Sequence, residues 1–313
     1  MKFGLQLNPY VGRNPWETVQ SAAEVLDASR FDSLWLYDHF LYEGGYGPHG
    51  HPYPEPVLEC FATLAAVAAT TQRIRLGQLV TAVPYRNPAM LAKIATTLDL
   101  ISHGRLILGL GAGWHQREYE AYGYGAWPPA PERLRRLGEA LEVILELWTE
   151  SPASFEGEFY RLQDVRESTL PAQRPHPPIL IGGNGERVTL RLVARHAQMC
   201  NVQGTPAEIE RLLGILRVHC ETAGRPYEEI VRTMYTTVLV APTGAAAAAK
   251  AERFKDYYPR RGWLAGTPAQ IVDALGEYVA AGIEYVIFRM PDWHELDGVR
   301  LFDAEVIPPL LSF

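Results

Sequence analysis

Residues 74–110 read IRLGQLVTAVPYRNPAMLAKIATTLDLISHGRLILGL, and this stretch shows how the whole chain is organised. An apolar, β-rich run at Ile74–Val80 is followed by an Asn–Pro pair that opens a helical pattern over Ala89–Ser102. Proline at the start of a helix and glycine just after its end are common boundaries, and Gly104 follows this segment. A second apolar run, Leu106–Leu110, begins at once. This strand–helix–strand order predicts a parallel sheet with crossover helices.

The same alternation continues along the chain and gives eight predicted strands. They are Lys2–Leu7, Ser33–Asp38, Ile74–Val80, Leu106–Leu110, Ile179–Ile181, Met199–Val202, Thr233–Val240 and Glu284–Arg289. Their nearly continuous apolar character is typical of parallel strands covered on both faces. The clearest helical patterns between them cover Trp16–Ser29, Ala89–Ser102, Pro131–Glu150 and Ala269–Ala281. Since eight strands close a barrel, the sequence predicts an α/β fold, a (β/α)8 TIM barrel, as one domain over residues 1–313.

Three segments are too long to be simple connections in such a barrel. Phe40–Pro56 and Thr243–Gly266 follow the second and seventh strands, so we expect binding loops or lids at the C-terminal rim. The third segment, Ser151–Pro178, precedes the fifth strand and belongs to the opposite rim. It contains SFEGEFYRLQD at 154–164, which predicts a small structural hairpin.

Composition excludes several classes of function. The 313 residues include 29 basic and 36 acidic side chains, a net charge of −7, which argues against a nucleic-acid or membrane partner. Cys60, Cys200 and Cys220 are too few and too scattered for a disulfide framework or a zinc site. The N-terminal MKFGLQLNPY lacks a secretory pattern, and no apolar run approaches the roughly 20 residues of a membrane span. We therefore expect a cytoplasmic protein.

A polar pair ends the second predicted strand, in SLWLYDHF at 33–40. In barrels of this kind the active site lies at the C-terminal ends of the strands, where Asp38 and His39 fall. An imidazole titrates near neutral pH, so His39 could relay a proton. The pair could equally hold the loop that follows, and the residues alone leave both interpretations open.

Two glycine turns follow other strands. In RLILGLGAGW at 105–114, the glycines Gly109, Gly111 and Gly113 would let the backbone approach a ligand, or would let strands pack closely. No dinucleotide fingerprint follows this turn. In PPILIGGNGERVTLRLVARHA at 177–197, Gly182–Gly185 leads directly into an amphipathic helix pattern. Backbone N–H groups at a helix start bind anions, which favours a phosphate site over a plain tight turn.

Hydrolytic chemistry has little support at this rim. The first strand ends in Leu7–Asn8–Pro9 without a His-x-His pair, and His49 and His51 lie in a loop without carboxylates at the neighbouring strand ends. A nucleophile elbow is also missing. We therefore expect no metal. A proton-handling histidine, a phosphate turn and many aromatic side chains suit a flat organic cofactor instead.

Five motifs in order resemble one known family. FDSLWLYDHF, TQRIRLGQLVTAVPYRNPAMLAK, LDLISHGRLILGLGAGWHQREYEAYG, SFEGEFYRLQD and RPHPPILIGGNGERVTLRLVARHA are similar to the luciferase-like monooxygenase superfamily, and more narrowly to its F420-dependent oxidoreductase branch. The similarity runs from Met1 to about Ala223 and resumes at GTPAQIVDALGEYVAAGIEYVIF. The resemblance implies a barrel that binds F420, a deazaflavin that carries hydride. Related branches use FMN as monooxygenases supplied by a partner reductase, and a non-catalytic cofactor-binding barrel is a third alternative.

The resemblance also implies roles for particular residues. Asp38 and His39 would lie beside the reactive ring as the catalytic pair, with His39 as proton relay or ring contact. A non-proline cis peptide at Leu79–Val80 would support the ring, and the turn at Gly182–Gly185 would hold the cofactor phosphate. The cofactor-binding residues implied in this way are Asp38, His39, Leu79, Val80, Thr81, Gly111, Gly113, Gly182, Gly183, Asn184 and Gly185.

One departure from the family bears on the substrate. Sugar-phosphate dehydrogenases of this superfamily have an acidic residue just after the glycine turn of the fourth strand, where this chain has Trp114. Their basic cluster for a substrate phosphate has no evident counterpart here. We therefore expect a small apolar or aromatic substrate, in a pocket that includes Tyr42, Trp114 and His115. The resemblance further implies a homodimer and a partner reductase for flavin or F420.

Overall fold

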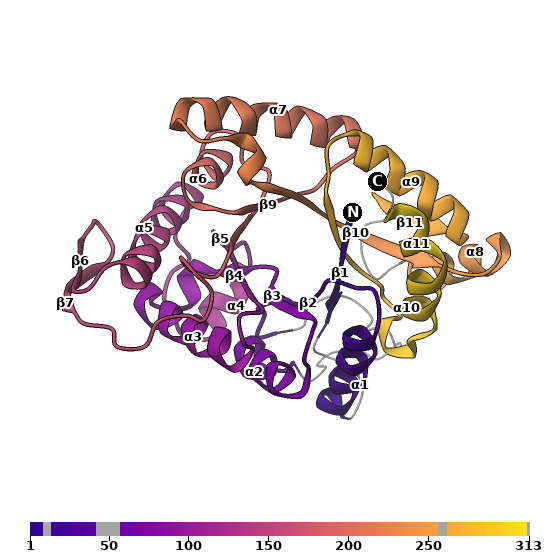
Figure 1. Ribbon diagram of the computed structural model, residues 1–313, viewed down its shortest axis with the longest axis horizontal. Coiled ribbons are helices and arrows are strands. Elements are labelled where there is room, and N and C mark those ends of the chain that lie inside the picture. Colours follow the sequence, from indigo (N-terminus) through magenta and orange to yellow (C-terminus); the bar gives the residue numbers. More distant parts are fainter. Residues whose placement is uncertain (9–13, 42–56, 256–261, 312–313) are drawn as a thin grey trace.

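The computed structural model describes residues 1–8, 14–41, 57–255 and 262–311. Eight parallel strands form a closed barrel inside a ring of helices, as predicted (Figure 1). In order around the barrel the strands are β1 (Lys2–Leu7), β2 (Ser33–Leu36), β3 (Arg75–Gln78), β5 (Leu106–Gly111), β8 (Ile179–Gly182), β9 (Met199–Val202), β10 (Val231–Val240) and β12 (Tyr285–Arg289). Pairing of β12 with β1 closes the ring.

Four short strands lie outside this ring of eight. β4 (Thr81–Ala82) pairs with the end of β5. The predicted hairpin is present as antiparallel β6 (Ala153–Glu156) and β7 (Arg161–Val165). β11 (Trp263–Gly266) runs parallel to the last residues of β10 and was not predicted. It lies in the predicted insertion 243–266, of which residues 256–261 are outside the described part of the chain.

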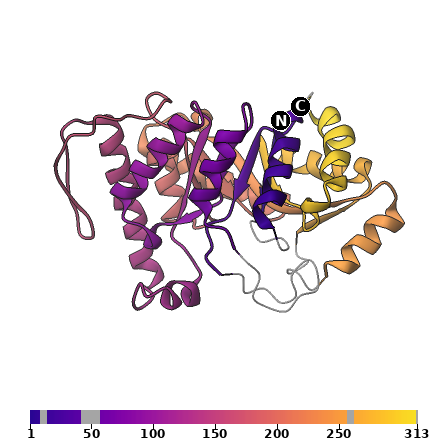
Figure 2. The same cartoon turned by 90° about the horizontal axis from the view of Figure 1, so that it is seen from below.

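Helices follow the strands and cover the outside of the barrel (Figures 1 and 2). They are α1 (Pro15–Ala28), α2 (Cys60–Thr70), α3 (Pro88–Ile101), α4 (Gln116–Ala121), α5 (Ala130–Thr149), α6 (Thr189–His196), α7 (Pro206–Ala223), α8 (Gly244–Arg253), α9 (Pro268–Ala280), α10 (Asp297–Leu301) and α11 (Ile307–Leu310). The expected caps are present: Asn87 accepts the N–H groups of Ala89 and Met90 at the start of α3, and Gly104 beyond its end has a φ of +82°. None of the described helices is long and apolar enough to cross a membrane.

The indole of Trp35 fills the centre of the barrel. Glycines face it from the neighbouring strands: a Cβ on Gly4 would lie 2.6 Å from Trp35 Nε1, and one on Gly77 would lie 2.6 Å from Trp35 Cε3. Trp35 Nε1 donates a hydrogen bond to Ser33 Oγ, and the hydroxyl of Tyr285 donates to the same oxygen. Trp35 and Tyr285 belong to a buried apolar cluster, and Leu79 and Val80 pack against it.

Candidate active site at the C-terminal rim

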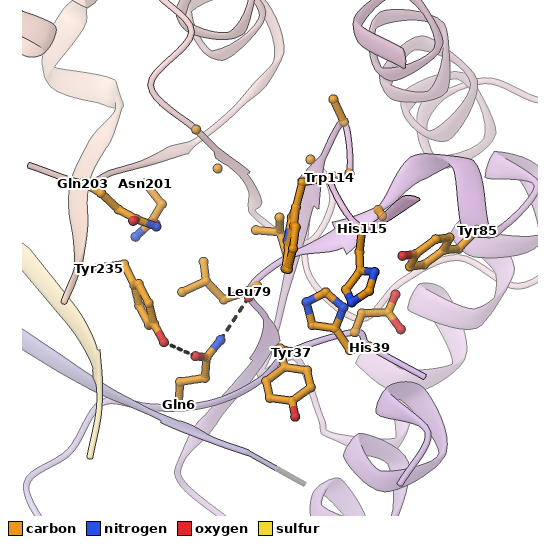
Figure 3. Close-up of a pocket in the computed structure, with 18 of the residues that line it drawn as sticks. Gln6, Tyr37, His39, Leu79, Tyr85, Trp114, His115, Asn201, Gln203 and Tyr235 are labelled. Carbon is orange, nitrogen blue, oxygen red and sulfur yellow. Dashed lines mark hydrogen bonds between the residues drawn. The ribbon is translucent and has the colours of Figure 1, made fainter. Parts of the chain in front are cut away.

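A cavity of about 740 Å³ opens at the C-terminal ends of the strands (Figure 3). All eight barrel strands, or the residues just after them, contribute to its lining. Its predicted members are Asp38, His39, Leu79, Val80, Gly111, Gly113, Trp114, His115, Gly182 and Gly183. Thr81, Asn184 and Gly185 were predicted to bind cofactor but do not line this cavity. Tyr42, His49 and His51 lie outside the described residues.

The peptide bond between Leu79 and Val80 is cis, at the position that the sequence resemblance implied. Gln6 braces this peptide from β1: its side-chain Nε2 donates to the Leu79 carbonyl at 3.0 Å. The Tyr235 hydroxyl on β10 donates in turn to Gln6 Oε1 (Figure 3). The backbone at the floor of the cavity is therefore held by side chains from two other strands.

The glycines of the neighbouring strands make room for Val80. A Cβ on Gly111 would lie 2.7 Å from a Val80 methyl carbon, and one on Gly182 would lie 3.1 Å from another. A Cβ on Gly109 would lie 1.9 Å from the backbone carbonyl oxygen of Gln78. Close packing of the chain therefore accounts for Gly109 and Gly111, which was one of the two interpretations that their sequence left open, and Gly182 is crowded in the same way. Gly111 and Gly182 also line the cavity.

Asp38 and His39 do not form a hydrogen-bonded couple with each other. The Asp38 carboxylate is 2% exposed and receives two hydrogen bonds from the Arg86 guanidinium, the one to Oδ1 at 3.0 Å. Arg86 also donates to Glu59 Oε1 at 2.7 Å. Burial raises the pKa of Asp38, and the Arg86 charge opposes that shift. Through Arg86 and Glu59, Asp38 thus links the end of β2 to the starts of α3 and α2.

His39 instead pairs with Glu118 of α4, a residue that the sequence did not single out. His39 Nδ1 lies 2.9 Å from Glu118 Oε2, and the Tyr85 hydroxyl donates to the same oxygen at 2.6 Å. Glu118 Oε1 accepts the backbone N–H groups of Phe40 and Leu41. Burial alone would raise the pKa of Glu118, but the hydrogen bonds from His39 and Tyr85 hold it below its ordinary value. The carboxylate is therefore ionised at neutral pH.

Trp114 and His115 follow the glycine turn of β5 and lie beside His39 (Figure 3). Gly113 has a φ of +79°, a conformation that favours glycine, and it redirects the chain into α4. The Trp114 side chain is 72% exposed, with its ring centroid 5.3 Å from that of His39. His115 caps α4, because its Nδ1 accepts the N–H of Glu118 at 3.2 Å.

The predicted phosphate turn is arranged differently from the expectation. α6 begins at Thr189 rather than directly after Gly185, because residues 186–188 form a turn first. The Asn184 side chain exchanges hydrogen bonds of 2.6 and 3.0 Å with the backbone of Gln203, so it joins β8 to β9. Gly182, Gly183 and Thr189 do line the cavity. Phosphate binding at this edge stays a prediction.

Five polar residues of the cavity lining come from β1, β9, β10 and β12 or from just after these strands, and we call them the polar wall: Gln6, Asn201, Gln203, Tyr235 and Arg289. Figure 3 shows its labelled members on one side of Leu79, with Trp114, His115 and His39 on the other. Asn201 and Arg289 lie near the ends of predicted strands, and a polar residue at that position is the signal in the sequence that points to them. Within residues 1–8, 14–41, 57–255 and 262–311, no group of three His, Cys, Asp or Glu side chains could hold a metal ion.

Known proteins resemble the chain along nearly all of its length. The family model for luciferase-like monooxygenases matches residues 1–261. F420-dependent glucose-6-phosphate dehydrogenase of Kineococcus radiotolerans is 30% identical, over 89% of this chain and 88% of that protein. The enzyme of the same name from Amycolatopsis mediterranei is 29% identical, over 89% and 90%.

Solved structures have the same fold. Monooxygenase RslO1 from Streptomyces bottropensis superimposes with a TM-score of 0.82 at 24% identity, covering 99% of this chain and 100% of that one. The coenzyme F420-dependent tetrahydromethanopterin reductase from Methanopyrus kandleri gives a TM-score of 0.79 at 21% identity, covering 98% and 99%. From the match of the family model over residues 1–261 it follows that this chain belongs to the luciferase-like monooxygenase family.

Proposed function

We propose that the protein is an F420-dependent oxidoreductase that transfers a hydride between the deazaflavin and a small organic substrate. One observation carries this proposal: His39, paired with an ionised buried carboxylate, lines a cavity of about 740 Å³ with an apolar floor at Leu79 and Val80. Pockets of roughly 300–1,000 Å³ hold ligands of cofactor size. The names of the relatives support F420 as that cofactor.

The residues present fit a flat ring that carries a phosphate tail. Leu79 and Val80 offer an apolar surface for one face of the ring, and Asn201 and Gln203 offer amides to its polar edge. Gly182, Gly183 and Thr189 would receive the phosphate near the start of α6, where the helix dipole favours negative charge. When bound, the deazaflavin supplies the hydride chemistry, while the protein supplies orientation and electrostatics. His39 would move the accompanying proton.

The proposed substrate is small and apolar or aromatic. Of the described residues that line the cavity, Arg289 alone carries a Lys or Arg side chain, so a basic cluster for a phosphorylated sugar is not seen among them. Exposed Trp114 and the ring of Tyr37 offer apolar contact at the mouth. We expect turnover with small aromatic or aliphatic alcohols or carbonyl compounds, and none with glucose 6-phosphate. Loss or recovery of the visible absorbance of oxidised F420 would measure turnover with the small substrates and with glucose 6-phosphate.

Titration of the purified protein with F420 and with FMN tests the choice of cofactor. We expect F420 to bind at least about tenfold more tightly, a difference of about 1.4 kcal/mol. Selective binding of FMN, together with oxygen-dependent turnover in the presence of a reductase, would instead establish the monooxygenase alternative. Binding of F420 without turnover of any substrate in a broad panel would favour a non-catalytic barrel.

A further inference from the structure

We infer that Glu118 is a positioning residue, which holds the His39 ring in the tautomer whose Nε2 can accept a proton from the substrate. The inference rests on the proposed function, because it concerns the proton that accompanies hydride transfer. Its evidence is the hydrogen-bond geometry around one carboxylate.

The Glu118 side chain is completely buried, and its two oxygens accept from three donors besides facing the His39 ring. Oε1 receives the backbone N–H groups of Phe40 and Leu41, the second at 2.8 Å. Oε2 receives the Tyr85 hydroxyl and faces His39 Nδ1. A protonated carboxyl group would need an acceptor for its own hydrogen, and these neighbours supply donors. The arrangement therefore favours the ionised form of Glu118 over the protonated form, because carboxylate oxygens can only accept hydrogen bonds.

The carboxylate oxygen of Glu118 beside His39 Nδ1 determines which ring nitrogen carries the imidazole proton. A neutral imidazole carries one hydrogen, and the hydrogen bond to Glu118 places it on Nδ1. Nε2, on the opposite side of the ring, then presents a lone pair. Trp114 and His115 pack beside the ring, with centroid distances of 5.3 and 5.6 Å, and limit its rotation. His39 lines the cavity, so the lone pair is available to a bound substrate.

This tautomer matches oxidation of an alcohol. The carbon–hydrogen bond of the substrate would break and its electron pair would leave as hydride, for which oxidised F420 would supply the acceptor. The hydroxyl proton passes to His39 Nε2, and the carbonyl double bond forms. The resulting imidazolium is stabilised across the ring by the negative charge of Glu118. Reduction of a carbonyl compound is the reverse: imidazolium Nε2–H donates the proton to the oxygen.

The Glu118→Gln variant reverses the tautomer, because the backbone orients the new amide. The N–H groups of Phe40 and Leu41 require an acceptor, so the amide oxygen takes the Oε1 position. The amide NH2 then occupies the Oε2 position and donates to His39 Nδ1. The imidazole hydrogen must move to Nε2, where it cannot accept the substrate proton. The size of the side chain hardly changes.

Nitrogen-15 NMR of histidine-labelled protein and steady-state kinetics test the inference together. In Glu118→Gln we expect the His39 signals to change from the Nδ1–H to the Nε2–H pattern. We expect kcat to fall by about 10²–10⁴-fold, the range for loss of a general base or of its correct tautomer. The Kd for F420 should stay within a few-fold of the wild-type value, since Glu118 does not line the cavity.

Glu139→Gln is the matched control. The Glu139 carboxylate also accepts backbone N–H groups, those of Glu158 and Phe159 at 2.8 and 2.9 Å, but it lies on α5 and does not line the cavity. We expect unchanged kcat and an unchanged His39 tautomer in this variant. If both variants lose similar thermal stability, a fall in kcat confined to Glu118→Gln separates positioning from general loosening of the fold.

A double variant keeps the inference testable if Glu118→Gln is poorly stable. Added to His39→Ala, Glu118→Gln should cause no further loss of kcat, because residues that act as one unit are non-additive. A further loss, or a wild-type kcat in Glu118→Gln, would overturn the inference. So would a fall in kcat with the Nδ1–H tautomer retained. Failure of wild-type protein to bind F420 would refute the proposed function instead, and the tautomer measurement would still test Glu118.

Discussion

Asp38 and His39 are neighbours in the sequence, but their side chains belong to different hydrogen-bond networks. Successive residues at the end of an extended segment point to opposite sides, so Asp38 faces Arg86 and His39 faces Glu118. The sequence predicts that both residues lie at the rim, because they end an apolar strand. It could not predict their partners, which lie 48 and 79 residues further along the chain. The local sequence QREYEA at 116–121 does not show whether Glu118 or Glu120 will contact His39.

The His39→Ala variant tests the proton-handling role directly. We expect it to bind F420 with a Kd within a few-fold of the wild-type value, because the floor and the polar wall are untouched. Turnover should fall by about 10²–10⁴-fold, as for removal of a general base. Single-turnover measurements with bound cofactor would show the loss in the chemical step. Wild-type turnover in this variant would remove His39 from the mechanism.

The pKa of Glu118 leads to a pH-dependent contribution to stability. The folded protein holds this pKa below the ordinary value of 4.5, so the ionised carboxylate stabilises the fold at neutral pH. The contribution is fully present above the unfolded pKa and is lost as the pH falls through the lower folded pKa. Relative to wild type, Glu118→Gln should lose about 1–3 kcal/mol of unfolding free energy at pH 7. Urea denaturation at decreasing pH should show this difference shrinking below about pH 4.5; a constant difference would contradict the assignment.

At the scale of elements, the apolar runs predicted the barrel strands closely, and the exceptions have physical reasons. β1 and β9 have the predicted bounds, whereas β2 ends at Leu36 because the next residues leave the strand pairing and line the cavity. β11 was missed because WLAG is short, and it pairs only with the last four residues of β10. Which strand such a segment joins depends on tertiary structure, and no local pattern encodes it.

The contact between Trp35 and its two glycines gives a prediction about β3. In Gly77→Ala the new Cβ would overlap the indole ring, which is enclosed on all sides. Overpacking of this kind costs about 1–3 kcal/mol, so we expect a lower unfolding free energy in urea. Gly214→Ala on α7 is the control: a Cβ there meets nothing within 4 Å, and helical alanine should stabilise by up to about 1 kcal/mol. Equal effects of the two changes would contradict the packing argument.

At the scale of the whole molecule, the barrel was predictable because the alternation of apolar strand with helix repeats eight times along the sequence. The cavity was only partly predictable, since residues from all eight strands, or from just after them, meet there from distant parts of the sequence. The predicted cofactor-binding residues at the ends of β2, β3, β5 and β8 line the cavity, with the exceptions of Thr81, Asn184 and Gly185. The polar wall, with residues from β1, β9, β10 and β12, forms only when the ring of strands is closed.

The outer surface supports the proposed homodimer. α3 exposes Met90, Leu100 and Ile101, an apolar set on one helix that a second copy could cover. We expect a dimer in sedimentation velocity, and a monomer when Met90 and Ile101 are both replaced by Glu. Val218→Glu, at an equally exposed apolar position on α7, should leave the dimer intact. A monomeric wild-type protein would refute the proposal.

The glycines that contact Val80 limit how the proposed cofactor-binding surface can be redesigned. Because Gly111 and Gly182 both make room for Val80, a side chain at either glycine would press on the valine that forms the floor. Shortening Val80 to Ala, by contrast, would add no atom beside either glycine. An engineer who wants room for a bulkier ring should therefore start from Val80 and leave the two glycines unchanged.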